Sequence, residues 1–301
     1  MLVVIWPIFA LICLGFGLRR IGIFSAEFWS AAERLNYFVL FPALLISSLA
    51  RAPLHDPTLL RLGLAAILVL LIGAGLLYLA KALRPMPAAR FGPVLQGVLR
   101  FNTYLGMAIL AALGGTEAIE RAAVYLAIAV PMVNVLAILA LSEEGAWRRP
   151  MVMVRQVALN PLVLGCIVGA FLAVTGIGLP FGSQQFFTLM AQGSLPLGLL
   201  SVGAALQPVV SRRDFVALFA TSFARLLLMP GLAALCAGVM GLPPAETLVL
   251  VLFSAIPTAP TAYILTRQLG GDGPFMAGLI TAQTLAALVT IPLVLGLAGL
   301  P

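Results

Sequence analysis

Residues 253–267 read FSAIPTAPTAYILTR, and they lie within an apolar segment long enough to cross a membrane. Pro257 and Pro260 stand close together there, with Thr258 and Thr261 beside them. Proline in a helix interior removes a hydrogen bond and costs about 3 kcal/mol. Broken backbone at membrane depth is tolerated only where protein buries it or where it lines a cavity. The stretch predicts a discontinuous membrane helix beside a polar site; the alternative is a simple kink whose threonines bond to their own helix.

The composition around this stretch is that of a polytopic helical membrane protein. Of the 301 residues, 62% are hydrophobic and 9% are charged, whereas soluble domains carry roughly 25% charged residues. The apolar residues form long runs, and a membrane-spanning helix needs about 20 of them. No part of the chain is polar enough for a separate soluble domain. The net charge of +7 does not indicate nucleic-acid binding, because the basic residues lie in short loops, where they set topology.

Ten apolar runs predict ten transmembrane helices. They cover residues 2–18, 31–50, 58–80, 93–113, 121–141, 160–176, 185–207, 215–239, 245–267 and 275–298. The loops after odd-numbered spans carry Arg19, Arg20, Lys81, Arg84, Arg90, Arg148, Arg149, Arg155, Arg212, Arg213 and Arg267. The loops after even-numbered spans carry only Arg51, Arg61 and Arg121. Positive charge marks the cytoplasmic side, so both termini are expected outside. Lys81 is the only lysine among 17 basic residues, a bias that hints at a GC-rich bacterial genome, and the expected location is the bacterial inner membrane.

Proline positions indicate an internal repeat. Pro7 and Pro42 in the first two spans precede Pro161 and Pro196 in spans six and seven by the same offset, since 161 − 7 and 196 − 42 both equal 154. Five spans per half force the two halves into opposite orientations. We therefore expect a first repeat over 1–141, a cytoplasmic linker with an interfacial helix over 142–159, and an inverted second repeat over 160–301.

The same offset pairs the opening stretch with RFNTYLGMA at 100–108, a polar interruption of the fourth span. Broken helices at corresponding positions of inverted repeats point to the binding site of a secondary transporter. Their half-helix N-termini act as partial positive charges and bind carboxylates. The predicted substrate-binding residues are Asn102, Thr103, Gly106, Pro257, Thr258, Pro260, Thr261, Asn134 and Arg225.

Two of these residues have competing interpretations. Arg225 is the only charge near the middle of an apolar run; it either helps to hold an anion or gating partner, or it pairs structurally. Asn134 on the fifth span either borders the site or bridges helices, as Gln283 does. Arg100 stands beside the fourth-span interruption and either faces a vestibule or plays a structural part.

The absence of certain residue types from the spans limits which coupling ions, metals and reactions the chain could use. No Asp or Glu occupies the centre of a span, although proton relays and many sodium sites use such carboxylates. The only histidine, His55, lies in a loop, and the cysteines Cys13, Cys166 and Cys236 show no metal-binding spacing, so we expect no enzyme activity, metal or cofactor. We expect a carrier that exports a small organic anion, driven by the membrane potential. The alternatives are a symporter coupled to sodium or protons, and a channel or sensory module.

With these residues identified, the chain resembles the auxin efflux carrier family, which includes bacterial relatives of the plant PIN carriers. The similar stretches are GFGLRRIGIF, LNYFVLFPALLISSL, RFNTYLGM, NPLVLGCIVG, LPLGLLSVGAAL, ARLLLMPGL and FSAIPTAP, in this order along nearly the whole chain. The resemblance implies two inverted five-span repeats, as in bile-acid sodium symporters, with crossing broken spans four and nine. It also implies a scaffold of spans one, two, six and seven that forms homodimers, and an elevator-type transport domain. Substrates of the family are indole acids or dicarboxylates such as malate and malonate.

This chain departs from the family at the fourth span. Family members usually have a proline shortly after the Asn and Gly, whereas here Gly106 is followed by Met107, Ala108 and Ile109. We therefore expect an unequal crossover, in which FSAIPTAPTAYILTR exposes more backbone than its partner does.

Overall fold

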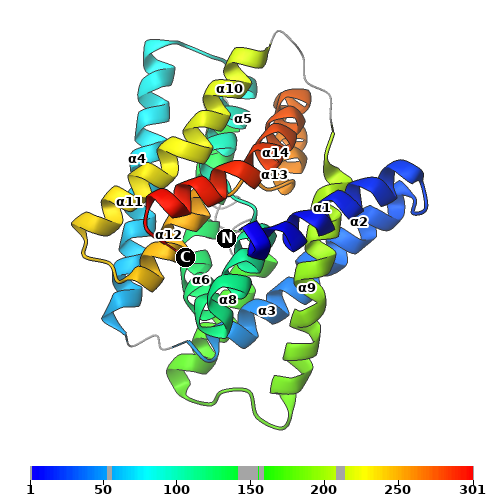
Figure 1. Cartoon of the computed structure of the whole chain (residues 1–301), viewed down its shortest axis with the longest axis vertical. Helices are drawn as coiled ribbons and strands as arrows, with labels where there is room; N and C mark the ends of the chain where they lie inside the picture. Colours follow the sequence, from blue (N-terminus) through cyan, green and yellow to red (C-terminus); the bar gives the residue numbers. More distant parts are fainter. Residues whose placement is uncertain (1, 53–55, 142–154, 156–158, 208–213, 301) are drawn as a thin grey trace.

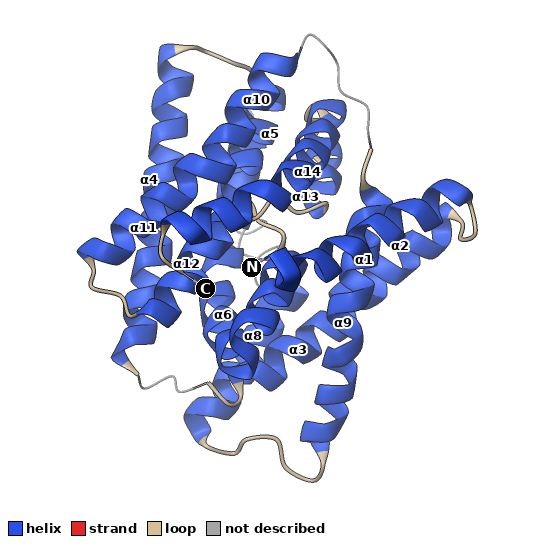
Figure 2. Cartoon of the chain, viewed as in Figure 1, coloured by secondary structure: helices blue, strands red, loops and turns tan. Residues whose placement is uncertain are grey.

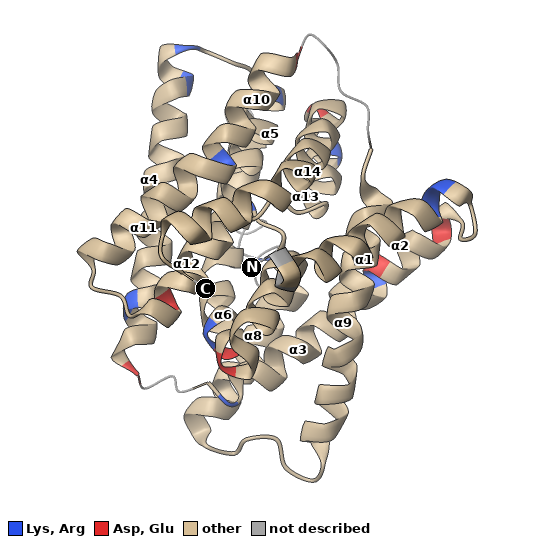
Figure 3. Ribbon diagram, in the orientation of Figure 1, with Lys and Arg blue, Asp and Glu red and all other residues tan. Residues whose placement is uncertain are grey.

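The computed structural model describes residues 2–52, 56–141, 155, 159–207 and 214–300, and within these ranges the regular elements are all helices (Figures 1 and 2). The interfacial helix predicted in the 142–159 linker lies almost entirely outside the described residues. Five helical segments are long and apolar enough to cross a membrane: Pro57–Leu83, Ala88–Leu141, Ser183–Ala205, Phe215–Val239 and Gly273–Leu297. Figure 3 shows that charged residues lie mostly near helix ends and in loops. The chain is a multi-pass helical membrane protein.

Each predicted apolar run coincides with helix, though not always with one continuous helix. In the first half the elements are α1 (Leu2–Ile21), α2 (Ala26–Leu35), η1 (Asn36–Leu40), α3 (Phe41–Leu49), α4 (Pro57–Leu83), α5 (Ala88–Leu99) and α6 (Thr103–Leu141). In the second half they are α8 (Pro161–Thr175), α9 (Ser183–Ala205), α10 (Phe215–Phe223), η4 (Ala224–Leu228), α11 (Met229–Val239), α12 (Pro244–Ala255), α13 (Thr261–Gln268) and α14 (Gly273–Leu297). Gly115, at φ 59°, bends α6 between the fourth and fifth runs.

Helix starts follow local capping rules. Asp56 accepts a hydrogen bond from the Thr58 amide at the start of α4, and Asn160 accepts one from the Leu162 amide at the start of α8. Asp272 accepts one from the Phe275 amide at the start of α14. Each cap satisfies an amide that has no intrahelical partner. A proline follows each cap in the first turn, where its missing N–H costs nothing.

Small residues bring α1 close to α9 and α3 close to α8. A Cβ on Gly15 would overlap the Leu200 backbone, and one on Gly203 would overlap the Ile12 backbone. A Cβ on Gly165 would press on Pro42. Close backbone approach through glycine is a common way for helices to associate in membranes. In Figure 1, α1, α2 and α9 lie together on one side of the molecule, and α4, α10 and α11 lie on the other.

Ion pairs fasten the remaining helices at two places. Arg90 at the start of α5 pairs with Asp214, just before α10, and with Asp272, just before α14. Elsewhere, Arg121 on α6 donates to the Glu246 carboxylate on α12 at 2.8 Å. Glu246 also accepts from the hydroxyl of Thr58 on α4. These pairs join α5 with α10 and α14, and α4 with α6 and α12.

Removing Arg121 is expected to destabilise this second connection. Glu246 is only 2% exposed, and the Arg121→Ala variant leaves its charge without a cation. We expect a loss of about 3 kcal/mol, measured as a lower unfolding temperature in detergent. The control is Arg51→Ala, because Arg51 is 39% exposed in a longer pair with Glu120, and that loss should stay under about 1 kcal/mol. Equal losses in the two variants would contradict the prediction.

Candidate functional site

The fourth and ninth apolar runs are both interrupted, and the two interruptions touch. Helix α5 ends at Leu99 and α6 begins at Thr103, while α12 ends at Ala255 and α13 begins at Thr261. The second interruption is the longer one, covering 256–260 against 100–102. The Asn102 amide donates to the Pro257 carbonyl at 2.9 Å, so the two extended segments are joined by their main chains.

Asn102 starts the helix that follows the first interruption. Its side-chain oxygen accepts a hydrogen bond from the Leu105 amide at 3.2 Å, which is the role of an N-cap residue. The amide of Asn102 is at the same time engaged by Pro257, outside its own helix. These bonds explain how the fourth run is interrupted without a proline of its own. They also direct the N-terminus of α6 towards the N-terminus of α13.

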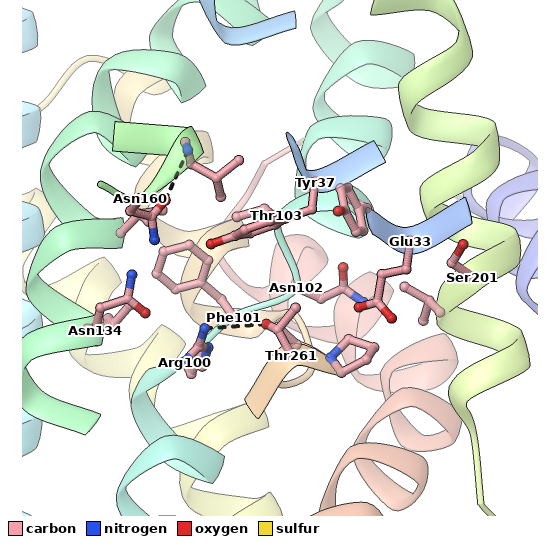
Figure 4. Close-up of a pocket in the computed structure, with 17 residues that line it drawn as sticks. Glu33, Tyr37, Arg100, Phe101, Asn102, Thr103, Asn134, Asn160, Ser201 and Thr261 are labelled. Atoms are coloured by element: carbon pink, nitrogen blue, oxygen red, sulfur yellow. Dashed lines mark hydrogen bonds between the residues drawn. The ribbon is translucent and has the colours of Figure 1, made fainter. Parts of the chain in front are cut away.

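A cavity lies at these N-termini, and residues from α2, α6, α8, α9 and α13 are among those that line it (Figure 4). Its lining residues are Glu33, Tyr37, Arg100, Phe101, Asn102, Thr103, Tyr104, Val130, Val133, Asn134, Asn160, Leu162, Ser201, Val202, Ala259, Pro260 and Thr261. A wider cavity of about 560 Å³ adjoins it and shares Glu33, Arg100 and Thr261. We call the two cavities together the chamber: the wider one is large enough for a small organic molecule, and the inner one, of about 40 Å³, has room for a group of the size of a carboxylate.

Arg100 and Glu33 bring opposite charges to the chamber. Arg100 donates to Gln96 and to the Thr261 hydroxyl, each at 3.3 Å. Among the described residues, no carboxylate forms an ion pair with Arg100. Glu33 comes from α2, and within the same ranges its carboxylate takes part in none of the ion pairs. An unpaired guanidinium beside two helix N-termini favours an anion.

Two buried polar atoms of the chamber have no hydrogen-bond partner within the described part of the chain. They are the side-chain nitrogen of Asn102 and the hydroxyl oxygen of Ser201. Asn102 is 1% exposed and Ser201 is 6% exposed. Leaving such a group unsatisfied costs about 1–3 kcal/mol. Both residues line the cavity, where a bound molecule could satisfy them.

The structure divides the predicted site residues into two sets. Asn102, Thr103, Asn134, Pro260 and Thr261 line the chamber. The other predicted residues do not line the chamber; they are Gly106, Pro257, Thr258 and Arg225.

Each residue of the second set has a packing or bonding partner. The Thr258 hydroxyl lies 2.7 Å from the side-chain oxygen of Gln283, whose nitrogen donates to the Gly97 carbonyl at 2.8 Å. Gly106 faces the Phe253 ring, which leaves no room for a Cβ. Within the described part of the chain, Arg225 donates to main-chain carbonyls and to no side chain. Gln283 therefore bridges the α12–α13 interruption and α5, which agrees with the expectation that it bridges helices.

Among the lining residues that sequence reasoning missed, the polar ones from distant helices are Glu33, Tyr37, Asn160 and Ser201. Glu33 stands near the start of its span, so its charge was not counted as intramembrane. The one available signal was spacing, because Ser30, Glu33 and Tyr37 fall on one helical face, and all three line the wider cavity. For Asn160 and Ser201 the sequence offers no comparable signal.

Comparisons with known proteins identify membrane transporters as similar to this chain. Residues 147–295 match the family described as membrane transport protein. An "Uncharacterized transporter" of Methanothermobacter thermautotrophicus is 25% identical over 95% of this chain and 94% of its own length. A "Putative malonate transporter" of Rhizobium meliloti is 25% identical over 95% of this chain and 92% of its own length. These matches support a membrane transport protein and agree with the resemblance to the auxin efflux carrier family.

Proposed function

We propose that this protein is a secondary carrier that exports a small organic anion through the chamber between its two interrupted helices. The observation that carries the proposal is the buried side-chain nitrogen of Asn102, which lines the chamber and has no partner among the described residues. A carboxylate there could accept from Asn102, Arg100 and the free amides at two helix N-termini. These donors are neutral or positive, which suits an anion.

The substrate class follows from the size and charge of the chamber. Arg100 can hold one carboxylate, and the Ser201 hydroxyl and Asn134 amide can hydrogen-bond another polar group. One relative is named as a putative malonate transporter. We propose small dicarboxylates, malonate first, as the compounds to test, and indole acids as the second class.

The mechanism proposed is an elevator movement between inverted repeats of five spans. The wider cavity reaches Arg34 and Gln268, and a third cavity beside Glu33 reaches Arg19 and Arg20. Positive charge assigns these residues to the cytoplasmic side, which supports an inward-open state. The helices fastened by Arg90 and Arg121 would move as a unit against α1, α3, α8 and α9.

Further parts of the proposal concern placement and assembly. We place the protein in the bacterial inner membrane with both termini outside, on the basis of the loop charges. We also propose a homodimer formed through the scaffold helices. Exposed apolar side chains on α1 and α8, such as Trp6 and Phe171, both 60% exposed, face either lipid or this second copy. Cross-linking of single-cysteine variants on these helices tests the dimer.

The driving force has two candidates. Export of an anion gains about 2.3 kcal/mol per charge per 100 mV of inside-negative potential, with no co-ion. Glu33 favours a second candidate, a proton-coupled symporter, because an intramembrane carboxylate in a transport chamber is a common proton carrier. Substrate flux into proteoliposomes, measured under an imposed potential and under an imposed pH gradient, decides between them. Flux that follows potential alone supports the uniporter, and accumulation driven by the pH gradient alone supports the symporter.

Binding itself is tested with a matched pair of serines. Ser201 and Ser222 each have a buried hydroxyl without a partner among the described residues, but only Ser201 lines the chamber. We expect malonate to raise the unfolding temperature of the purified protein. Ser201→Ala should weaken malonate binding about 3- to 10-fold, the worth of one hydrogen bond, and Ser222→Ala should not. If no organic acid of either class binds, the proposed function is wrong.

A further inference from the structure

Arg225 is one of the most deeply buried side chains in the described part of the chain. It lies on η4, between α10 and α11, and is 1% exposed. It lines none of the three cavities around the crossover. Among the described residues it has no carboxylate partner. A buried charge is costly unless it is paired and hydrogen-bonded, so its stabilisation must come from elsewhere.

The stabilisation comes from the C-terminal ends of the two broken helices. The guanidinium donates to the Ile256 carbonyl at 2.7 Å and to the Phe253 carbonyl at 2.6 Å, both at the end of α12. It also donates to the Val98 carbonyl at 3.1 Å, in the last turn of α5. The last carbonyls of a helix have no intrahelical partners, and each helix C-terminus carries about half a negative charge. The partial negative charges of two such helix ends add up to about one, which balances the positive charge of the guanidinium.

Neighbouring carbonyls of the crossover are also occupied by protein donors. The Gly97 carbonyl accepts from the Gln283 side chain, and the Pro257 carbonyl accepts from the Asn102 amide. In many secondary transporters, half-helix C-termini and unwound carbonyls hold the coupling sodium ion. Here the corresponding oxygens of α5 and α12 surround a positive charge that belongs to the chain.

We propose that Arg225 is a tethered cation that does the work of a coupling ion. It permanently joins the C-terminal ends of α5 and α12, and thereby presets the N-terminal ends of α6 and α13 for an anion. Arg225 is then a positioning residue, since it acts on the chamber only through the crossover backbone. The consequence for transport, that anion binding needs no sodium, rests on the proposed function; the joining of the two helices does not.

The test compares Arg225→Ala and Arg225→Lys with the wild type in sodium-free buffer, with choline as the replacement cation. The first readout is hydrogen exchange of the amides in 97–103 and 254–261, which requires no substrate. We expect slow exchange in the wild type with or without sodium, and fast exchange in Arg225→Ala. Guanidinium ion at millimolar concentration should slow the exchange again, whereas choline should not. Arg225→Lys should lie between the two, because it keeps the charge but loses the fork of donors.

Malonate affinity provides the second readout. It should fall about 10-fold or more in Arg225→Ala, and guanidinium should restore part of it. The control is Arg121→Ala, which also loses stability but should keep slow exchange at the crossover and show no rescue. A wild-type affinity that requires sodium, or an Arg225→Ala protein with wild-type exchange, would overturn the proposal. If Arg225→Ala does not fold, the proposal is tested by hydrogen exchange of Arg225→Lys at the crossover and by whether wild-type malonate binding requires sodium. Failure of every acid to bind, with normal exchange results, would refute the transport function but not the tethered cation.

Discussion

Replacing Arg100 with glutamine is expected to lower malonate affinity about 10- to 100-fold, because hydrogen bonds to charged groups are worth about 1.5–3 kcal/mol. Arg100 lines both adjoining cavities and pairs with no carboxylate among the described residues. Its charge is therefore available to a ligand. Titration calorimetry of the purified variant measures the loss. Transport at saturating malonate should fall less than transport at low malonate, since the defect is in binding.

Two further arginine variants isolate the effect of the charge. Arg100→Lys keeps a cation in place and should recover part of the affinity, though less than all of it, because lysine lacks the planar fork of donors. Arg61 on α4 is exposed and lines none of the three cavities. Arg61→Gln therefore removes a distant positive charge and should leave the malonate affinity unchanged. If Arg100→Gln binds malonate like the wild type, the anion does not lie at the crossover.

Replacing Glu33 with glutamine is expected to raise malonate affinity about 10-fold at neutral pH. The Glu33 carboxylate lines the same chamber as Arg100. When it is ionised it repels a bound anion, because two like charges about 8 Å apart repel by about 2 kcal/mol at an effective dielectric constant near 20. In the wild type, affinity should rise as the pH falls, because protonation removes the negative charge of Glu33. In Glu33→Gln this rise should be absent. Tyr37, Tyr104, Arg34 and Arg100 also line the cavities beside Glu33, but tyrosine and arginine side chains ordinarily titrate far above this pH range.

The matched control for Glu33 lies on the same helix. Glu27 is exposed and lines none of the three cavities, so Glu27→Gln should keep the affinity and pH profile of the wild type. The same variants address the driving force. If the protein is a proton symporter, Glu33→Gln loses accumulation driven by a pH gradient but keeps counterflow. If the malonate affinity of the wild type does not depend on pH, Glu33 neither repels the bound anion nor carries the coupled proton.

Prolines were a useful but incomplete guide to the interrupted helices. Pro257 and Pro260 do stand in an interruption, whereas Pro196 lies inside an unbroken α9 and Pro131 inside α6. The interruption at 100–102 contains no proline. Asn102 is placed there by a side-chain cap and by a main-chain bond to Pro257. The second bond reaches across the fold, so no local pattern could reveal it. The greater length of the 256–260 interruption agrees with the expected inequality.

The sequence by itself determined that the chain is helical, where its apolar helices lie and which two are interrupted. Those features show in local composition, whereas the bond between Asn102 and Pro257 that holds the first interruption does not. Only the tertiary structure decided what each polar side chain faces, because the rotation of a helix is set by packing against its neighbours. Thr261 thus reaches the chamber while Thr258 bonds to Gln283. Glu33 and Ser201 enter from distant helices, and Arg225 meets carbonyl groups instead of the substrate chamber.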